Sequence, residues 1–150
     1  MTVLREWRRG PFVVSTDPAR LDLPLVQRWL ATESYWARGI PLDVVRRAAD
    51  GSVNFGLYEG AAQVGYARVV TDQATFAWLA DVFVVAPHRA RGLGAWLIGC
   101  VLACPELQGL RSWVLATVDA HELYRRFGFV ESEPGRLMRK HDLEIYVRAR

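Results

Sequence analysis

In residues 75–104, a strand-forming segment, a glycine-containing turn and an apolar helix-forming segment follow one another directly. Residues 75–85 are rich in β-branched and aromatic side chains, which favour a strand. The apolar positions of residues 93–104 go all round a helix, so this helix should be buried against a sheet rather than half exposed. A buried helix that follows a strand without a linker is typical of α/β architectures, in which helices cover the faces of a sheet.

The rest of the chain supplies further strands and helices around this unit. Glu59-Gly60 and residues 71–73 are hairpin signals, and they separate three strand-forming segments. The predicted strands are residues 12–16, 54–58, 63–70, 75–85, 113–115, 129–131 and 143–147, and the predicted helices are residues 24–30, 42–49, 93–104 and 120–127. Antiparallel hairpins followed by strand–helix–strand units predict a three-layer α/β fold. Its mixed central sheet should have about six or seven strands, with helices on both faces.

Length and hydropathy limit where such a chain can work. At 150 residues, of which 51% are hydrophobic, we expect one domain over residues 1–150. The longest apolar run, residues 95–104, is too short to span a membrane. Charged residues near the start, among them Arg5 and Glu6, interrupt any signal-peptide core. The sequence therefore predicts a cytoplasmic protein with no membrane partner.

Charge and cysteine usage exclude two further classes of site. The chain has 19 basic and 16 acidic residues, a net charge of +3, and the arginines do not cluster as they would in a nucleic-acid interface. Cys100 and Cys104 lie four residues apart on one predicted helix, and no second Cys or His pair is spaced to complete a zinc site. We expect no nucleic-acid partner and no metal, and both thiols should be core residues.

The turn between the strand and the apolar helix has the chemistry of a phosphate site. Helix N-termini carry unpaired backbone N–H groups and partial positive charge. Gly92 and Gly94 would let a ligand oxygen approach those groups, and Arg89 and Arg91 add positive charge. No Lys-Ser/Thr pair follows the glycines, which excludes an ATP-hydrolysing P-loop. The alternative is a turn that merely permits a tight connection, but the arginines favour a di- or polyphosphate site.

Two motifs together resemble the GNAT superfamily of N-acetyltransferases. Arg89, Gly92 and Gly94 match its acetyl-CoA signature, Arg/Gln-x-x-Gly-x-Gly/Ala, and residues 123–129, Leu-Tyr-Arg-Arg-Phe-Gly-Phe, match its Tyr-x-x-Phe-Gly-Phe helix ending. The resemblance implies that acetyl-CoA is the co-substrate, with its pyrophosphate on the turn amides and its pantetheine arm paired with the preceding strand, where two strands splay apart. The residues implied to contact it are Val82, Phe83, Val84, Arg89, Ala90, Arg91, Gly92, Leu93, Gly94 and Ala95. Dimers are frequent among such enzymes, so a homodimer is one expectation.

Tyr124 is the first candidate catalytic residue. When an amine attacks a thioester, a thiolate is expelled, and it leaves more readily if a nearby donor protonates it. A phenol with a pKa near 10 is neutral at pH 7 and can be that donor. An isolated tyrosine would more simply be a core residue, but Tyr124 matches the family's thiol-contacting tyrosine.

Asp81 is the second candidate, as the general base. Strict alternation along residues 75–85 groups Asp81 with Leu79, Phe83 and Val85 on one face, where a carboxylate is costly unless it is paired. A hairpin symmetric about Gln73 would put Arg68 opposite Trp78, on the other face, where it could not neutralise Asp81. Such an environment suits a base that takes a proton from an ammonium group. A structural carboxylate that caps backbone N–H groups is an equally weighted alternative, and water or His121 could take the proton instead.

The acceptor is expected near Glu33, Tyr35 and Trp36, in the loop where related enzymes build the acceptor pocket. Exposed aromatics beside a carboxylate would suit a cationic amine, although Trp36 could equally pack under the loop. The sequence thus predicts transfer of an acetyl group from acetyl-CoA to a primary amine, on a small molecule or a peptide, by direct attack. The alternative is a non-catalytic module that binds acyl-CoA as a sensor or interaction domain.

Overall fold

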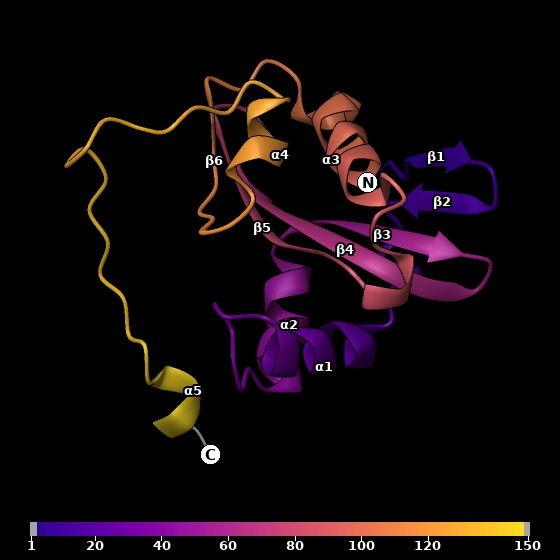
Figure 1. Ribbon diagram of the computed structural model, residues 1–150, viewed down its shortest axis with the longest axis horizontal. Helices are drawn as coiled ribbons and strands as arrows, with labels where there is room; N and C mark the ends of the chain where they lie inside the picture. Colours follow the sequence, from indigo (N-terminus) through magenta and orange to yellow (C-terminus); the bar gives the residue numbers. More distant parts are fainter. Residues whose placement is uncertain (1–2, 149–150) are drawn as a thin grey trace.

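The computed structural model describes residues 3–148 as three layers (Figure 1). A six-stranded sheet forms the middle layer. Helices α1 (Leu23–Glu33) and α2 (Leu42–Asp50) cover one face, and α3 (Leu93–Ala103) and α4 (His121–Arg125) cover the other. The predicted mixed sheet with helices on both faces is therefore confirmed.

The strands are arranged in the order of the sequence. They are β1 (Glu6–Arg9), β2 (Phe12–Ser15), β3 (Val53–Glu59), β4 (Ala62–Thr71), β5 (Phe76–Val84) and β6 (Ser112–Val114). All neighbours pair antiparallel except β5 and β6, which are parallel. This exception follows from α3, which carries the chain back across the sheet between β5 and β6, as a crossover between parallel strands requires. Short 3-10 helices complete the connections: η1 (Pro18–Arg20), η2 (Ala86–His88) and η3 (Pro105–Leu107).

Two apolar cores lie on the two faces of the sheet. The larger core surrounds α3, in which Leu97, Ile98 and Val101 have no or almost no exposed surface, as its all-round apolar sequence predicted. The smaller core lies under α1 and α2. Cys100 and Cys104 are both free and buried in the larger core, and burial raises the pKa of the Cys100 thiol to about 11. The prediction that they serve as core residues is confirmed.

A β-bulge at Asp81 reverses the alternation of β5. Asp81 has a left-handed backbone, with a φ of 55°, and the pairing of β4 with β5 shifts between Tyr66 and Arg68. A bulge inserts one unpaired residue, so the side chains beyond it change face. Leu79 therefore belongs to the α3 core together with Val82 and Val84, whereas Phe83 faces α1 and α2. The strict alternation predicted for this strand was wrong from Asp81 onward.

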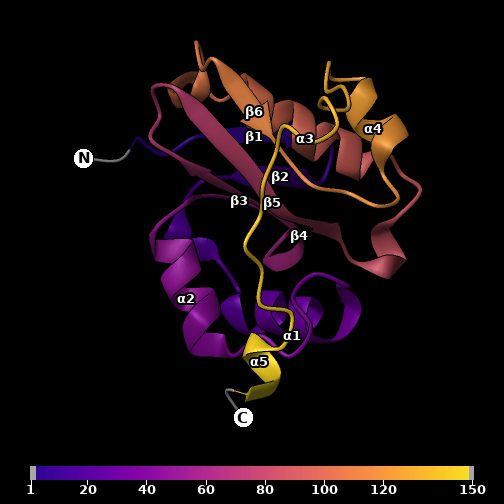
Figure 2. The same ribbon diagram turned by 90° about the vertical axis from the view of Figure 1, so that its left-hand side faces the viewer.

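The C-terminal part differs most from the sequence-based prediction. Residues 129–131 form no strand, and residues 143–147, predicted as the last strand, include the start of a short helix, α5 (Ile145–Arg148). Within the described residues no neighbouring strand meets this segment, and Asp142 accepts a hydrogen bond from the Glu144 N–H (3.1 Å), which favours a turn. The chain after α4 runs as an extended segment past the sheet to α5, beside α1 and α2 (Figure 2). Strand β1 was not predicted, because its sequence, Glu-Trp-Arg-Arg, is mostly charged.

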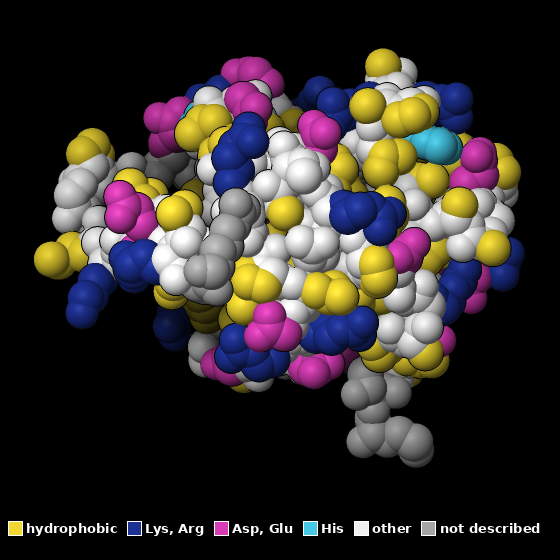
Figure 3. Space-filling view, turned by 90° about the horizontal axis from the view of Figure 1, so that it is seen from below, with side chains coloured by type: hydrophobic (Ala, Val, Ile, Leu, Met, Phe, Trp, Pro, Cys, Tyr) yellow, Lys and Arg dark blue, Asp and Glu magenta, His cyan; other side chains and the backbone are white. Residues whose placement is uncertain are grey.

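The α1 and α2 side of the surface mixes both signs of charge. Lys and Arg side chains lie among Asp, Glu and apolar side chains, and no patch of one sign dominates this face (Figure 3). Among residues 3–148, no helix is both long and apolar enough to cross a membrane.

Candidate active site

A cleft of about 440 Å³ gathers most of the residues predicted to act. It lies between the end of β5, the turn before α3, helix α4 and the end of α1. The predicted residues that line it come from all of these elements. They are Glu33, Tyr35, Trp36, Val82, Phe83, Val84, Arg89, Ala90, Gly92, Leu93, Gly94 and Tyr124.

The N-terminus of α3 presents unpaired backbone donors to this cleft. The first helical hydrogen bond runs from the Trp96 N–H to Gly92 O (3.1 Å), so the three N–H groups before Trp96 have no partner within the helix. No side chain caps this end, and the cap residue Gly92 has a φ of 75°, which favours glycine. A Cβ on Gly94 would meet only Val84, at 3.9 Å, so this position is open on the cleft side. These are the requirements for binding a phosphate group.

Beyond Trp78, the edge of β5 that faces β6 carries no strand within the described residues. The two strands pair only over Phe76–Trp78 and Ser112–Val114. The Val85 N–H donates to Val64 O of β4 (2.9 Å), so by alternation the N–H and C=O groups of Val84 point to the open edge. Arg89 confirms this direction, because its Nε donates to Val84 O (3.0 Å). The gap expected from the family resemblance is thus present.

Tyr124 brings a hydroxyl group to the same cleft. The residue is only 8% exposed and packs edge-on against Phe129. Its hydroxyl is not among the buried polar atoms without a partner, and within the described residues it makes no hydrogen bond, so it opens into the cleft. Burial, followed by the neighbouring Tyr35 and Asp119, raises the pKa of Tyr124 to about 12. The phenol is therefore neutral, with a proton to donate, throughout the physiological range.

An aromatic cluster forms the opposite wall of the cleft. Trp29 of α1 stacks on Phe83 with ring centroids 4.2 Å apart, and Trp36 lies 5.9 Å from Trp29 and 4.9 Å from Tyr35. The Tyr35 hydroxyl accepts a hydrogen bond from the Val118 N–H (3.1 Å), which joins this wall to the loop before α4. Trp29 was not predicted as a site residue because its helical spacing indicated a core position.

Two further residues of the cleft were also missed by the sequence analysis. Asp119, just before α4, lines the cleft together with Glu33, so the cleft has two acidic side chains. His88 lines the cleft next to the turn; its Nε2 is 3.3 Å from Glu59 Oε1 and its buried Nδ1 has no partner within the described residues. Neither residue was predicted to line the site, and it is the fold that brings both of them to the cleft.

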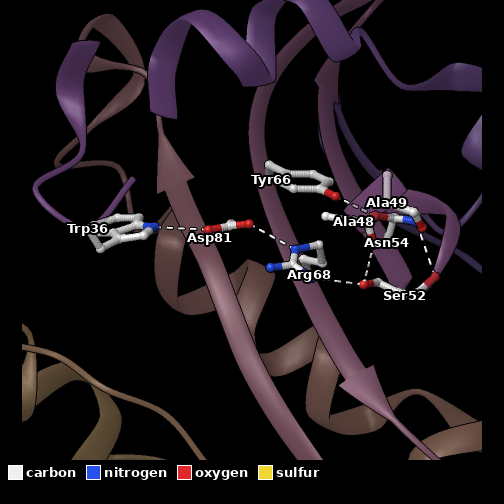
Figure 4. Close-up of polar contacts among 8 residues, drawn as sticks. All are labelled: Trp36, Ala48, Ala49, Ser52, Asn54, Tyr66, Arg68 and Asp81. Atoms are coloured by element: carbon white, nitrogen blue, oxygen red, sulfur yellow. Dashed lines mark hydrogen bonds and ion pairs between the residues drawn. The ribbon is translucent and has the colours of Figure 1, made fainter. Parts of the chain in front are cut away.

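Asp81 does not line the cleft but holds a polar network behind it (Figure 4). Its Oδ2 accepts a hydrogen bond from Arg68 Nε (2.8 Å), and its Oδ1 accepts one from Trp36 Nε1 (2.9 Å). Arg68 also donates to Ser52 Oγ (3.0 Å). The prediction that Arg68 could not neutralise Asp81 was wrong. Arg68 pairs opposite Ala80, which is on the face of Trp78, but the bulge at Asp81 turns the carboxylate toward the guanidinium.

Arg91 and Ala95, also predicted to contact the coenzyme, do not line the cleft. Arg91 is exposed at the turn, and Ala95 lies in the first turn of α3. Among residues 3–148, no group of three or more His, Cys, Asp or Glu side chains is arranged to hold a metal ion.

Comparison with known proteins gives a consistent family. The profile of the acetyltransferase (GNAT) domain matches residues 50–131. A Gibberella zeae protein assigned as an acetyltransferase is 32% identical over an alignment 146 residues long, gaps included, and the match covers 83% of this chain and 81% of that protein. The crystal structure of a Xanthomonas campestris protein assigned to the GNAT family is 47% identical, with a TM-score of 0.87 over 90% of this chain and 96% of that one.

A more distant structure shares the fold alone. It is a GNAT family acetyltransferase from Elizabethkingia anophelis with acetyl-CoA bound, which is 13% identical and has a TM-score of 0.63 over 83% of this chain and 80% of that one.

The profile match covers more than half of the chain, and both the strand before the turn and the helix of Tyr124 lie within it. The chain therefore belongs to the GNAT family of acetyltransferases.

Proposed function

We propose that this chain transfers the acetyl group of acetyl-CoA to a primary amine by direct attack. One observation carries the proposal: an open strand edge, an uncapped helix N-terminus and the free hydroxyl of Tyr124 face a single cleft. Binding of acetyl-CoA by the Elizabethkingia anophelis protein, which has the same fold, is consistent with this assignment.

Two sets of backbone groups in the cleft are proposed to bind two different parts of the coenzyme. The pyrophosphate is proposed to bind the N–H groups of Leu93 and Gly94, where the helix dipole favours negative charge. Arg89, which lines the same cleft, would add positive charge at this end. The pantetheine arm is proposed to pair with the open edge at Val82 and Val84, as an added strand would.

The chemistry then needs one bond to form and one to break. The amine nitrogen bonds to the acetyl carbon, the carbon–sulfur bond breaks, and the sulfur leaves with its electron pair. We propose that a backbone N–H group at the open edge of β5, that of Val82 or Val84, stabilises the charge that develops on the carbonyl oxygen. Tyr124 gives its proton to the departing sulfur and recovers one from water, which its pKa of about 12 permits.

The amine must lose its own proton before or during the attack. Arg68 and Trp36 already donate to the two carboxylate oxygens of Asp81, and protonation of Asp81 would weaken the ion pair with Arg68. We therefore propose water as the proton acceptor. The role proposed for Asp81 is to hold Trp36 and to attract the ammonium form of the acceptor, since a carboxylate has lone-pair sites for more than two donors.

The direct test is the release of free CoA thiol from acetyl-CoA across a panel of primary amines. Amine-dependent release is the expected result, with the mass of the acetylated amine as a second measurement. Binding of acetyl-CoA without release for any amine would instead support a non-catalytic, acyl-CoA-binding module. Absence of binding would overturn both the coenzyme and the reaction.

A further inference from the structure

A second cavity of about 170 Å³ lies behind Trp36, on the α1 and α2 face of the sheet. Its walls are apolar side chains of α1, α2 and the loop that joins them. The Tyr66 hydroxyl donates a hydrogen bond to Asn54 Oδ1. Among the residues that line the cavity, Arg68 and Asp81 are the charged ones, and their ion pair forms one corner. The side chains of this pair are 18% and 11% exposed, so the corner is largely shielded from solvent.

This cavity adjoins the open edge of β5. Trp36 lines both the cavity and the cleft. Asp81 lines the cavity, and the next residue, Val82, lines the cleft at the edge proposed for the thioester. A group held at the charged corner would therefore be one residue along β5 from the reacting end of the coenzyme.

We infer that this cavity receives the body of the acceptor, and that the acceptor is a small apolar primary amine. The inference rests on the proposed function, which supplies the acetyl group at the neighbouring edge. A dry cavity of about 150 Å³ holds a benzene molecule, so the acceptor body here has about six carbon atoms. Its amine lies at the Asp81 corner, and from there the nitrogen attacks the acetyl carbon as described above.

The walls discriminate against more polar amines. A sugar amine would bury hydroxyl groups among aliphatic side chains such as Val26 and Val45, with no partners for them. A polyamine would bury a second ammonium group at the end away from Asp81, at still higher cost. The aromatic wall and Glu33 attract a cation at the mouth of the cleft, but the cavity selects for an apolar body.

Tyr146 closes the cavity on the side of the charged corner. It is brought there by α5, at the end of the extended C-terminal segment, and packs on the core beneath α1 and α2. Burial raises the pKa of its hydroxyl, and nearby Asp81 adds to the effect, in keeping with its place beside the charged corner. The side chain is half-buried and belongs to a helix of four residues, so its removal should not unfold the protein.

The experiment is a chain-length series, propylamine to decylamine, in the thiol-release assay, with spermidine and glucosamine as polar comparators. We expect kcat/KM to rise about fourfold per methylene up to about six carbons and then fall. Ala48→Leu, which fills the cavity from α2, should shift the optimum to shorter amines, and Tyr146→Ala should shift it to longer ones. Ala103→Leu, the same change at an exposed position of α3, should leave the profile unchanged.

The outcomes separate this inference from the proposed function. Turnover of spermidine or glucosamine with a flat alkylamine profile would overturn the inference and leave the acetyltransferase reaction standing. If no amine supports thiol release, titration calorimetry with hexylamine still decides, because the parent should bind it and Ala48→Leu should bind it at least tenfold more weakly. Equal affinity in the two proteins, or no binding to either, would overturn the inference.

Discussion

Arg68 and Asp81 form an ion pair across the β4–β5 bulge, with Arg68 Nε 2.8 Å from Asp81 Oδ2. The two residues are not directly opposite, since Arg68 pairs in register with Ala80. The extra residue at the bulge turns the carboxylate toward the guanidinium and toward Trp36 Nε1. The same backbone distortion thus fixes a charge pair, an aromatic wall and the edge of the cleft.

Asp81→Asn should destabilise the fold by about 2 kcal/mol, because it leaves a largely buried Arg68 without its counter-charge. Urea unfolding would measure the change. The double variant Arg68→Met/Asp81→Asn should recover part of the loss, since no charge then remains unpaired. Additive losses in the double variant would show that the two residues act independently.

The activity of Asp81→Asn tests the choice of proton acceptor. With water as the acceptor, kcat/KM for the amine should fall by a similar factor at every pH from 6 to 9, because the variant loses amine binding and the position of Trp36. A loss that is large at low pH and shrinks toward pH 9, as the neutral fraction of the amine grows, would instead identify Asp81 as the general base.

Tyr124→Phe should lower kcat by about 10²-fold, the usual range for loss of a general acid, and should change the KM for acetyl-CoA little. The pKa of about 12 keeps the phenol protonated, so the deficit should be constant from pH 6 to pH 9. Tyr58→Phe, a tyrosine outside the cleft, is the matched control for kinetics. Unchanged turnover in Tyr124→Phe would remove its assigned role.

Gly94→Val should weaken acetyl-CoA binding about tenfold, because branched carbons would enter the cleft at the N-terminus of α3. The backbone φ of Gly94 is not left-handed, so the loss should come from lost access rather than from strain. Titration calorimetry measures the affinity, with Ala103→Val as the control. Binding as tight as in the parent would mean that the phosphates lie elsewhere.

Tyr58→Phe should stabilise the protein by about 1 kcal/mol at pH 7, because the buried hydroxyl has no partner within the described residues. Burial also raises the pKa of Tyr58 to about 12. A raised folded-state pKa means that the unfolded chain loses its proton first, so stability is full below pH 10 and declines as pH rises toward 12. Tyr58→Phe should show a shallower decline in chemical denaturation at pH 9 to 11, and a parallel decline would contradict the assignment.

Local patterns predicted the elements that the chemistry needs. The strand, turn and apolar helix around Gly92 could be predicted from short sequence patterns. The glycines indicate a tight turn, the arginines indicate an anion site, and the apolar residues on all sides indicate a buried helix. Tyr124 was found through its motif, and it does face the cleft. These features depend on residues close in sequence, which explains why the sequence sufficed for them.

The features that were missed depend on contacts between distant residues. The bulge at Asp81 cannot be recognised from the sequence pattern of β5. The predicted face of Phe83 was therefore wrong, and so was the prediction that Asp81 has no charged partner. Trp29 has the spacing of a core residue and also reaches the cleft. The alternation of residues 143–147 suits a strand, but no described strand lies beside it, and the segment ends in α5.

The left-handed residue in β5 has a consequence for how this gene can vary in length. A substitution at Asp81 alters one side chain. Deleting Asp81 would move the side chain of every later residue of β5 to the opposite face of the sheet. Val82 and Val84, which now pack against α3, would then face α1 and α2. Phe83, which stacks on Trp29, would face α3. We therefore expect single-residue deletions to be tolerated at the neighbouring Asp72–Thr75 hairpin tip and to be lethal to folding at position 81.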